Sequence, residues 1–163
     1  MIHYKKGRVI IRSVVESDLQ YLANNLRASD IAEIRASHDQ SPEQALRFSA
    51  GRSTWCAAVL HKGKPVAIFG LVPDDKADCA ASVWFLATDG LLGMWATFLR
   101  LSRKIIETML EKYPFLYNFV DDRNEKSIIW LKWCGATIDE PRPYGAAGLP
   151  FRFFAIARGK PNV

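Results

Sequence analysis

Residues 116–136 read LYNFVDDRNEKSIIWLKWCGA. Residues 116–121 combine aromatic, leucine and valine side chains in a pattern that is typical of a strand. Asn124 follows as the N-cap of a helix over residues 125–134, because its side-chain oxygen can accept hydrogen bonds from the first helical turn. Gly135 then ends the helix, since glycine readily adopts the left-handed conformation required there. This stretch therefore predicts a strand followed at once by a short capped helix.

A long helix is predicted before this strand, over residues 92–113. Its apolar residues recur at helical spacing, and Pro114 ends it. The apolar set is Trp95, Phe98, Leu99, Ile105, Ile106, Met109 and Leu110. The helix joins a strand at residues 79–87 to the strand at 116–121. We expect these two strands to be parallel neighbours, because right-handed crossovers return the chain to the same sheet.

The remaining elements complete a mixed sheet. Further strands are predicted at residues 8–15, 55–60, 65–72 and 151–157, and the short turns between 55 and 87 indicate an antiparallel meander. Helix starts are predicted at Ser17 (with Gln20), at Ser29 or Asp30, and at Ser41 (with Pro42, Gln44 and a stop at Gly51). The order predicts one α+β domain over residues 1–163, with a mostly antiparallel sheet, one parallel pair and flanking helices.

The composition argues against several classes of protein. A chain of 163 residues suits one domain. No apolar run approaches the roughly 18 residues of a membrane helix, and no apolar segment follows the basic N-terminus as in a secretory signal. The 3 cysteines and 3 histidines lack metal-ligand spacing. We therefore expect an intracellular chain with neither a metal site nor a disulfide framework.

The net charge of +5 is a mild excess, from 22 Lys and Arg against 17 Asp and Glu. Such an excess suits a nucleic-acid binder, a pocket for a phosphorylated cofactor or an ordinary surface. The basic residues are scattered. On the long helix Arg100, Arg103 and Lys104 are accompanied by Glu107 and Glu111, which favours a solvated face. Nucleic acid is not an expected partner.

Residues 124–136 resemble the GNAT superfamily of acyl-CoA N-acyltransferases. Members commonly carry an Asn, a small residue three positions later, and an aliphatic helix that ends in Gly, as Asn124, Ser127 and Gly135 do. The order of elements is also similar. The resemblance implies that the strands at 79–87 and 116–121 splay apart and leave a V-shaped cleft for acetyl-CoA.

Residues 79–89, 109–113, 117–120 and 124–136 look like the small GNAT-like proteins of short-tailed bacteriophages. One protein of that group is an internal virion protein. This resemblance implies a location in the cytoplasm of the bacterial host or in the virion interior, with phage structural proteins as partners.

The resemblance also implies which residues bind acetyl-CoA. They are Phe85, Leu86, Ala87, Gly90, Gly93, Met94, Asn124 and Ser127. A helix N-terminus can hold a pyrophosphate on its backbone N–H groups. Residues 88–95, however, depart from the Q/R-x-x-G-x-G/A spacing of the family, and Asp89 places a negative charge beside the phosphates. The alternatives are that Thr88 or Asp89 caps the long helix, and that Asn124 acts only as a helix cap.

Catalytic residues are less clearly marked. GNAT enzymes often place a Tyr as general acid in the helix after the fifth strand, and counting from Asn124 that position is Leu131, which cannot donate a proton. Asp121 at the strand end and Tyr144 in the loop 137–150 remain as candidates. Cys134 is expected to be a core thiol.

Two functions are consistent with these residues. The first is an acetyl-CoA-dependent N-acyltransferase-like protein with a degenerate catalytic signature, acting on a small amine or a protein amine. The second is a non-catalytic phage assembly or internal virion protein that retains the fold, since a fold does not determine a function.

Overall fold

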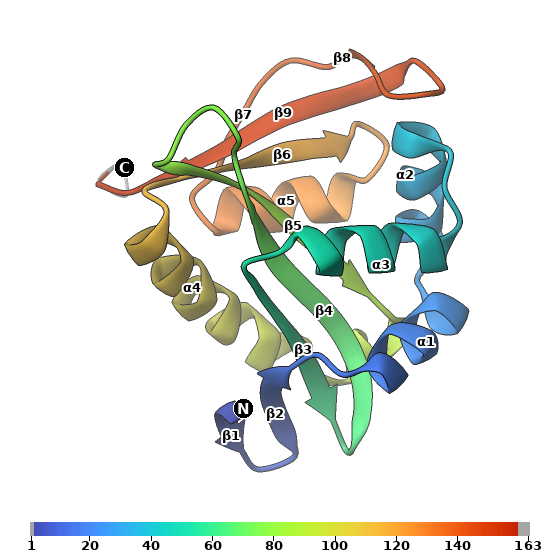
Figure 1. The fold of residues 1–163 in the computed structure, drawn as a ribbon, viewed down its shortest axis with the longest axis vertical. Helices are drawn as coiled ribbons and strands as arrows, with labels where there is room; N and C mark the ends of the chain where they lie inside the picture. Colours follow the sequence, from blue (N-terminus) through green and yellow to red (C-terminus); the bar gives the residue numbers. More distant parts are fainter. Residues whose placement is uncertain (1, 160–163) are drawn as a thin grey trace.

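The computed structural model describes residues 2–159, in which a single mixed sheet carries helices on both faces (Figure 1). The strand order is β1-β2-β3-β4-β5-β6-β9-β7, and β8 pairs with β9. The strands are β1 Ile2–Lys6, β2 Val9–Ser13, β3 Trp55–His61, β4 Lys64–Pro73, β5 Ala80–Ala87, β6 Phe115–Asp121, β7 Thr137–Ile138, β8 Arg142–Tyr144 and β9 Leu149–Ala157. Among these strands only β5 and β6 pair in parallel. The predicted α+β class and the predicted parallel pair are confirmed.

The helices form two layers. They are α1 Glu16–Asn25, α2 Ala28–His38, α3 Pro42–Arg52, the 3-10 helix η1 Asp89–Met94, α4 Trp95–Lys112 and α5 Glu125–Trp133. Alternate residues of β3 face opposite sides, as strand geometry requires. Ala58 packs with Leu22 of α1 and Leu46 of α3, whereas Val59 belongs to the core beneath α4 and α5.

Three helix boundaries differ from the sequence predictions. The first helix begins at Glu16 and not after Ser17, because Asp18 accepts a hydrogen bond from the Val15 N–H at 2.9 Å and pairs with Arg12 at 2.6 Å. The second helix begins at Ala28 and not at Ser29 or Asp30, with Arg27 as its N-cap. Gly51 lies inside α3, which ends at Arg52. The Ser41 capping box, in contrast, is confirmed.

The predicted helix 92–113 is divided into η1 and α4. Gly90 and Gly93 disfavour a regular α-helix at its start, and the Thr88 hydroxyl accepts a hydrogen bond from the Gly90 N–H at 3.2 Å. Thr88 therefore caps η1, and the predicted capping of the long helix by Thr88 or Asp89 is wrong, because α4 begins at Trp95 with Met94 as its N-cap and no side-chain cap. The strands β1, β7 and β8 are not predicted from the sequence, because they are short or polar and lack the β-branched runs of the other strands.

The parallel pair is short, and this opens the sheet. β5 and β6 pair only from Ala80 with Phe115 to Ser82 with Tyr117. Beyond that point a side-chain hydrogen bond takes the place of backbone pairing between β5 and β6: the Asn118 Nδ2 donates to the Val83 carbonyl at 2.8 Å. The two strands then diverge and leave the V-shaped cleft that the resemblance implies.

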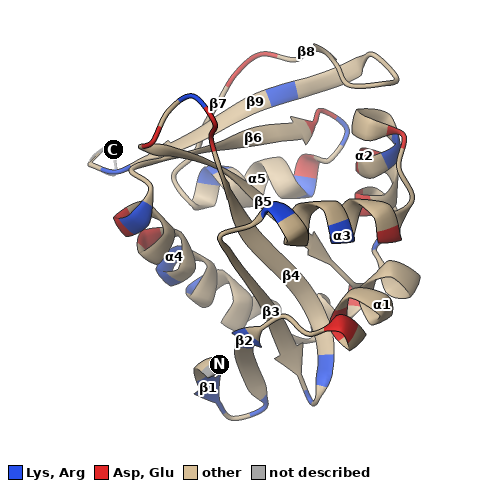
Figure 2. Ribbon diagram, in the orientation of Figure 1, with Lys and Arg blue, Asp and Glu red and all other residues tan. Residues whose placement is uncertain are grey.

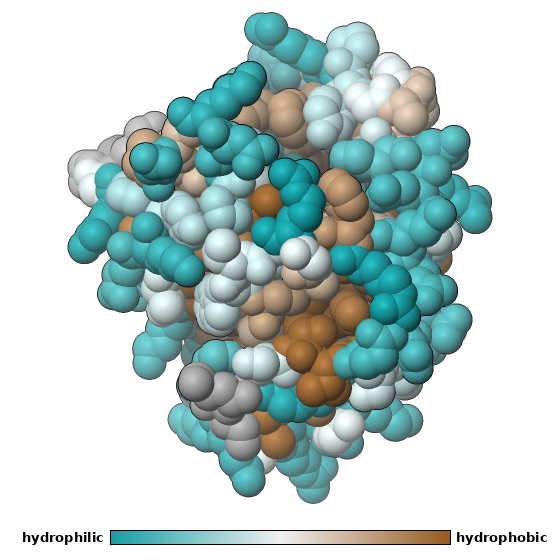
Figure 3. Space-filling model, viewed as in Figure 1, coloured by the Kyte–Doolittle hydropathy of each residue, from teal (hydrophilic) through white to brown (hydrophobic). Residues whose placement is uncertain are grey.

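Charge and hydropathy are distributed without a single dominant patch on the face shown. Basic and acidic residues accompany each other on α4 (Figure 2). Hydrophilic residues cover most of the face in Figure 3, and hydrophobic side chains gather where α1 meets β2 to β4. None of the helices within residues 2–159 has the length and apolar character needed to cross a membrane.

Candidate functional site

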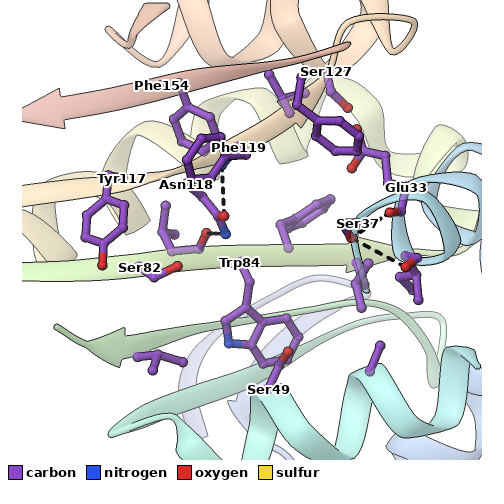
Figure 4. Close-up of a pocket in the computed structure, with 18 of the residues that line it drawn as sticks. Glu33, Ser37, Ser49, Ser82, Trp84, Tyr117, Asn118, Phe119, Ser127 and Phe154 are labelled. Atoms are coloured by element: carbon purple, nitrogen blue, oxygen red, sulfur yellow. Dashed lines mark hydrogen bonds between the residues drawn. The ribbon is translucent and has the colours of Figure 1, made fainter. Parts of the chain in front are cut away.

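The V-shaped cleft contains a cavity of about 570 Å³, which we call the cleft cavity. Three aromatic residues line it: the Trp84 indole extends from β5 toward Ser49 of α3, whereas Phe119 of β6 and Phe154 of β9 lie on the other side of β5 in this view (Figure 4). Glu33 and Ser37 of α2 lie at one end in this view, and Tyr117 at the other. The lining of the cleft cavity is therefore mixed, with aromatic side chains beside polar ones such as Ser82 and Asn118.

Glu33 is the most unusual ionisable group in the cleft cavity. Its Oε1 accepts hydrogen bonds from the Asp121 N–H at 3.0 Å and from Asn124 Nδ2 at 3.1 Å. Burial raises the pKa of the Glu33 carboxyl to about 7, and these two hydrogen bonds oppose that rise only in part. A carboxyl that titrates near neutral pH in a cleft is a candidate functional group.

Glu33 is not among the residues that the sequence predicts for the site. Its position three residues after Asp30 is the sequence signal that could have identified it, because residues three apart share one helix face. Asp30 Oδ2 accepts a hydrogen bond from the Ala87 N–H at 2.9 Å, and the Ala87 carbonyl accepts one from the Arg27 N–H at 3.0 Å. Residues at the start of α2 thus already form hydrogen bonds with the N–H and the carbonyl of Ala87, at the end of β5.

Four aromatic side chains fill the space between β5, α4 and α5. This aromatic cluster consists of Phe85, Trp95, Phe98 and Trp130, with neighbouring ring centroids 5.2 to 5.4 Å apart. The Trp130 indole N–H also donates to the Ser102 hydroxyl at 3.3 Å. The cluster lies between the first turns of α4 and the cleft.

The residues implied for acetyl-CoA are only partly brought together. Phe85, Leu86 and Ser127 line the cleft cavity, and Asn124 contacts it through Glu33. Asn124 also accepts a hydrogen bond from the Ser127 N–H at 3.3 Å, so its capping role is confirmed. The remaining implied residues are Ala87, whose backbone is bonded to α2, and Gly90, Gly93 and Met94, which lie in η1 and do not line the cavity.

The start of η1 does not fit a diphosphate. The N–H of Gly90 already donates to Thr88. A Cβ at Gly90 would lie 3.1 Å from Val66 Cγ1, so packing within the chain explains this glycine. Met94 is buried in the core, and Asp89 adds a negative charge. These contacts involve the start of η1 in packing and hydrogen bonds within the chain.

The two catalytic candidates have different surroundings. Asp121 is buried and pairs with Arg123 at 2.6 Å; burial raises its pKa, but the hydrogen bonds and charge of Arg123 outweigh that effect and lower it. Its carboxylate is therefore already neutralised within the chain. Tyr144 does line the cleft cavity and stacks on Phe119 with centroids 4.0 Å apart. Burial raises the pKa of the Tyr144 hydroxyl.

The loop 137–150 holds Tyr144 in place. The N–H groups of Ala146 and Ala147 donate to the Ser37 and Ala36 carbonyls at 3.0 and 3.1 Å, which closes the end of α2. Gly145 has a φ of +72°, and a Cβ there would lie 2.6 Å from Ser37 Cα. Only glycine permits this approach, so the loop forms a wall of the cleft cavity.

The position expected for a Tyr general acid is filled by Leu131, which is buried and lines the cleft cavity. Burial raises the pKa of the Cys134 thiol to about 11, so it remains protonated at neutral pH and a poor nucleophile. Within the described residues, no group of three or more His, Cys, Asp or Glu side chains could hold a metal ion.

Comparisons with known proteins agree with this geometry. A GNAT-family acetyltransferase of Bacillus anthracis superposes with a TM-score of 0.70 at 10% identity, covering 98% of this chain and 100% of that one. Spermidine N-acetyltransferase of Vibrio cholerae, solved with CoA and spermine, gives a TM-score of 0.66 at 13% identity over 95% and 98% of the two chains. At these identities the likeness establishes the fold.

The sequence comparison points to a bacteriophage protein. No family model matches the sequence. Over 108 residues the chain is 32% identical to the probable scaffold protein gp13 of Escherichia phage T7, covering 64% of this chain and 71% of that protein. The predicted resemblances to GNAT proteins and to phage proteins are both confirmed. The chain has the GNAT fold and belongs to the same family as the phage T7 protein gp13.

Proposed function

We propose that this protein acts in phage assembly as a non-catalytic component that retains the GNAT fold. The observation that carries the proposal is the aromatic cluster. If the diphosphate of acetyl-CoA lay at the start of α4, the rest of the molecule would have to pass Trp95 and Phe98 to reach the cleft. Phe98 packs there against Phe85 and Trp130. Each aromatic pair contributes about 1 kcal/mol beyond its buried area, so opening this path is costly.

Three further contacts support the same function. The Ala87 N–H, at the end of β5 where a thioester oxygen would be held, is bonded to Asp30. Leu131 occupies the place of the usual acid, and Gly90 is constrained by Val66. The relative in phage T7 is described as a probable scaffold protein. We place the protein in the host cytoplasm during assembly and in the particle interior afterwards, with phage structural proteins as its partners.

Mass spectrometry of purified procapsids and virions tests this function. We expect the protein in procapsids or virions at a fixed ratio to the major capsid protein, and a deletion of its gene to reduce the yield of complete particles. Its absence from both kinds of particle, together with a normal yield after deletion, would refute the assembly function.

Glu33 favours a second candidate, an N-acyltransferase that uses acetyl-CoA and a small or protein amine. With a pKa of about 7, its carboxylate could accept a proton from an amine in the cleft cavity. Mass spectrometry of spermine and of lysine peptides incubated with the protein and acetyl-CoA tests this candidate. An acetylated product that disappears in Glu33→Gln would replace the assembly proposal with catalysis.

A further inference from the structure

We propose that the cleft cavity binds an arginine side chain of a partner protein, whose guanidinium pairs with Glu33. This inference rests on the proposed assembly function and specifies the chemistry of the partner.

The carboxylates of the cleft cavity are unequally paired. Three of the four that line it already have a charged or hydroxyl partner in the chain. These are Asp30 with Arg27 (2.9 Å), Asp75 with Arg52 (3.6 Å) and Asp74 with the Tyr117 hydroxyl. Glu33 forms no salt bridge to the described residues. It accepts hydrogen bonds only from two uncharged groups, the backbone N–H of Asp121 and the side-chain amide of Asn124. A largely buried carboxylate without a cation is costly, so an external cation would complete the site.

One oxygen of Glu33 is available to such a ligand. Both of its hydrogen bonds go to Oε1. Every buried side-chain oxygen and nitrogen of the described residues has a hydrogen-bond partner. Oε2 has none, so it must reach accessible space, and Glu33 lines the cleft cavity.

The aromatic walls favour a guanidinium over an ammonium group. Phe119 and Tyr144 both line the cleft cavity and stack on each other, with ring centroids 4.0 Å apart. A planar, weakly hydrated guanidinium stacks on aromatic faces, whereas a compact ammonium keeps its water. The apolar stem of an arginine matches the remaining wall. The volume of about 570 Å³ is within the usual range for ligand pockets.

Binding should depend on pH through Glu33. The ionisable groups that face it are Asp30 on its own helix, Asp121 of β6 and Arg123 in the loop after β6. The two aspartates stay paired with Arg27 and Arg123. A guanidinium binds the ionised form of Glu33, so its affinity should fall about tenfold between pH 8 and pH 6 as Glu33 becomes protonated.

Proton–nitrogen NMR of the full chain tests the inference. The probe is Nα-acetyl-arginine methylamide, titrated to millimolar concentration at pH 8. The neutral isostere Nα-acetyl-citrulline methylamide is the matched control, and the lysine analogue is a third ligand. We expect the arginine probe to shift the backbone amide of Asp121 and the side-chain amide of Asn124, and citrulline to leave both unchanged.

A matched pair of variants completes the design. Glu33→Gln keeps an oxygen that accepts both hydrogen bonds but removes the charge, and should weaken arginine binding at least tenfold. Glu107→Gln removes an exposed charge on α4, outside the cavity, and should bind as the wild type does. Equal responses to arginine and citrulline, or undiminished binding by Glu33→Gln, would overturn the inference.

Three other outcomes complete the test, and the last two separate this inference from the proposed function. A stronger response to lysine than to arginine would overturn the guanidinium site and favour an amine acceptor pocket. The protein's presence in procapsids combined with no arginine response would refute the site while retaining assembly. An arginine response in a protein absent from all particles would refute assembly alone.

Discussion

Replacing Glu33 by Gln should stabilise the protein above pH 7, although it removes a group from the candidate site. The folded state raises the pKa of Glu33 from 4.5 to about 7, mainly through burial. The folded protein therefore holds this proton more tightly than the unfolded chain. Its contribution to stability is fully present below pH 4.5 and is lost as the pH rises through 7. The rise in pKa corresponds to about 3 kcal/mol.

Urea denaturation between pH 5 and pH 8 measures this effect. The wild type should lose about 3 kcal/mol of unfolding free energy across the range because of Glu33, and Glu33→Gln should lack that loss. Asp121 does not interfere, because its lowered pKa makes it stabilising above its unfolded value of 3.8, and that contribution is lost only in more acidic solution. Parallel pH curves for wild type and variant would refute the buried, unpaired state of Glu33. Glu107→Gln, on the exposed side of α4, should follow the wild type.

Three other perturbations test the packing. Trp130→Ala should lower the free energy of unfolding by about 3 kcal/mol in urea denaturation, because it removes the ring that packs on both Phe85 and Phe98. Trp133→Ala, at a side chain that is 46% exposed, should lower it by less than half as much. Asp18→Ala should lower the free energy of unfolding by about 3 kcal/mol, since it leaves Arg12 unpaired and the first helix uncapped. A loss below 1 kcal/mol would contradict that role of Asp18. Iodoacetamide at pH 7.5 should label exposed Cys79 and leave Cys134 unmodified in the folded protein, as read by mass spectrometry, because burial raises the pKa of the Cys134 thiol to about 11; equal labelling would contradict its burial.

The order of the main elements along the chain and the short capped helix could be predicted because their signals are local. Asn124 and Gly135 frame α5 as expected, and Gly135 has the left-handed φ of +92°. Ser41 and Gln44 form the predicted capping box. Such patterns act within four residues, so the sequence contains both partners.

The parts that could not be predicted depend on contacts between distant residues. Asp18 displaces the start of α1 because Arg12 pairs with it from the neighbouring strand. Glu33 becomes a site residue only when α2 reaches Asp121 and Asn124, 88 and 91 residues away in sequence. Periodicity identifies a helix face, but not the partner that the face meets.

The aromatic residues illustrate the same limit. Trp95 and Phe98 belong to the apolar set predicted for the long helix, and Trp130 lies in the predicted short helix. Their meeting with Phe85 at the cleft follows from how α4 and α5 lie against β5. The choice between catalysis and assembly therefore depends on tertiary packing, which no local sequence motif predicts.

Calorimetric titration of the purified wild-type protein with acetyl-CoA tests the central claim most directly, namely our proposal that the aromatic cluster and the start of η1 prevent this donor from binding. We predict no heat of binding up to 1 mM acetyl-CoA, which corresponds to a binding free energy weaker than about −4 kcal/mol. Binding of acetyl-CoA with a micromolar dissociation constant, and weaker binding by Gly93→Glu, would contradict the claim and favour an acyltransferase.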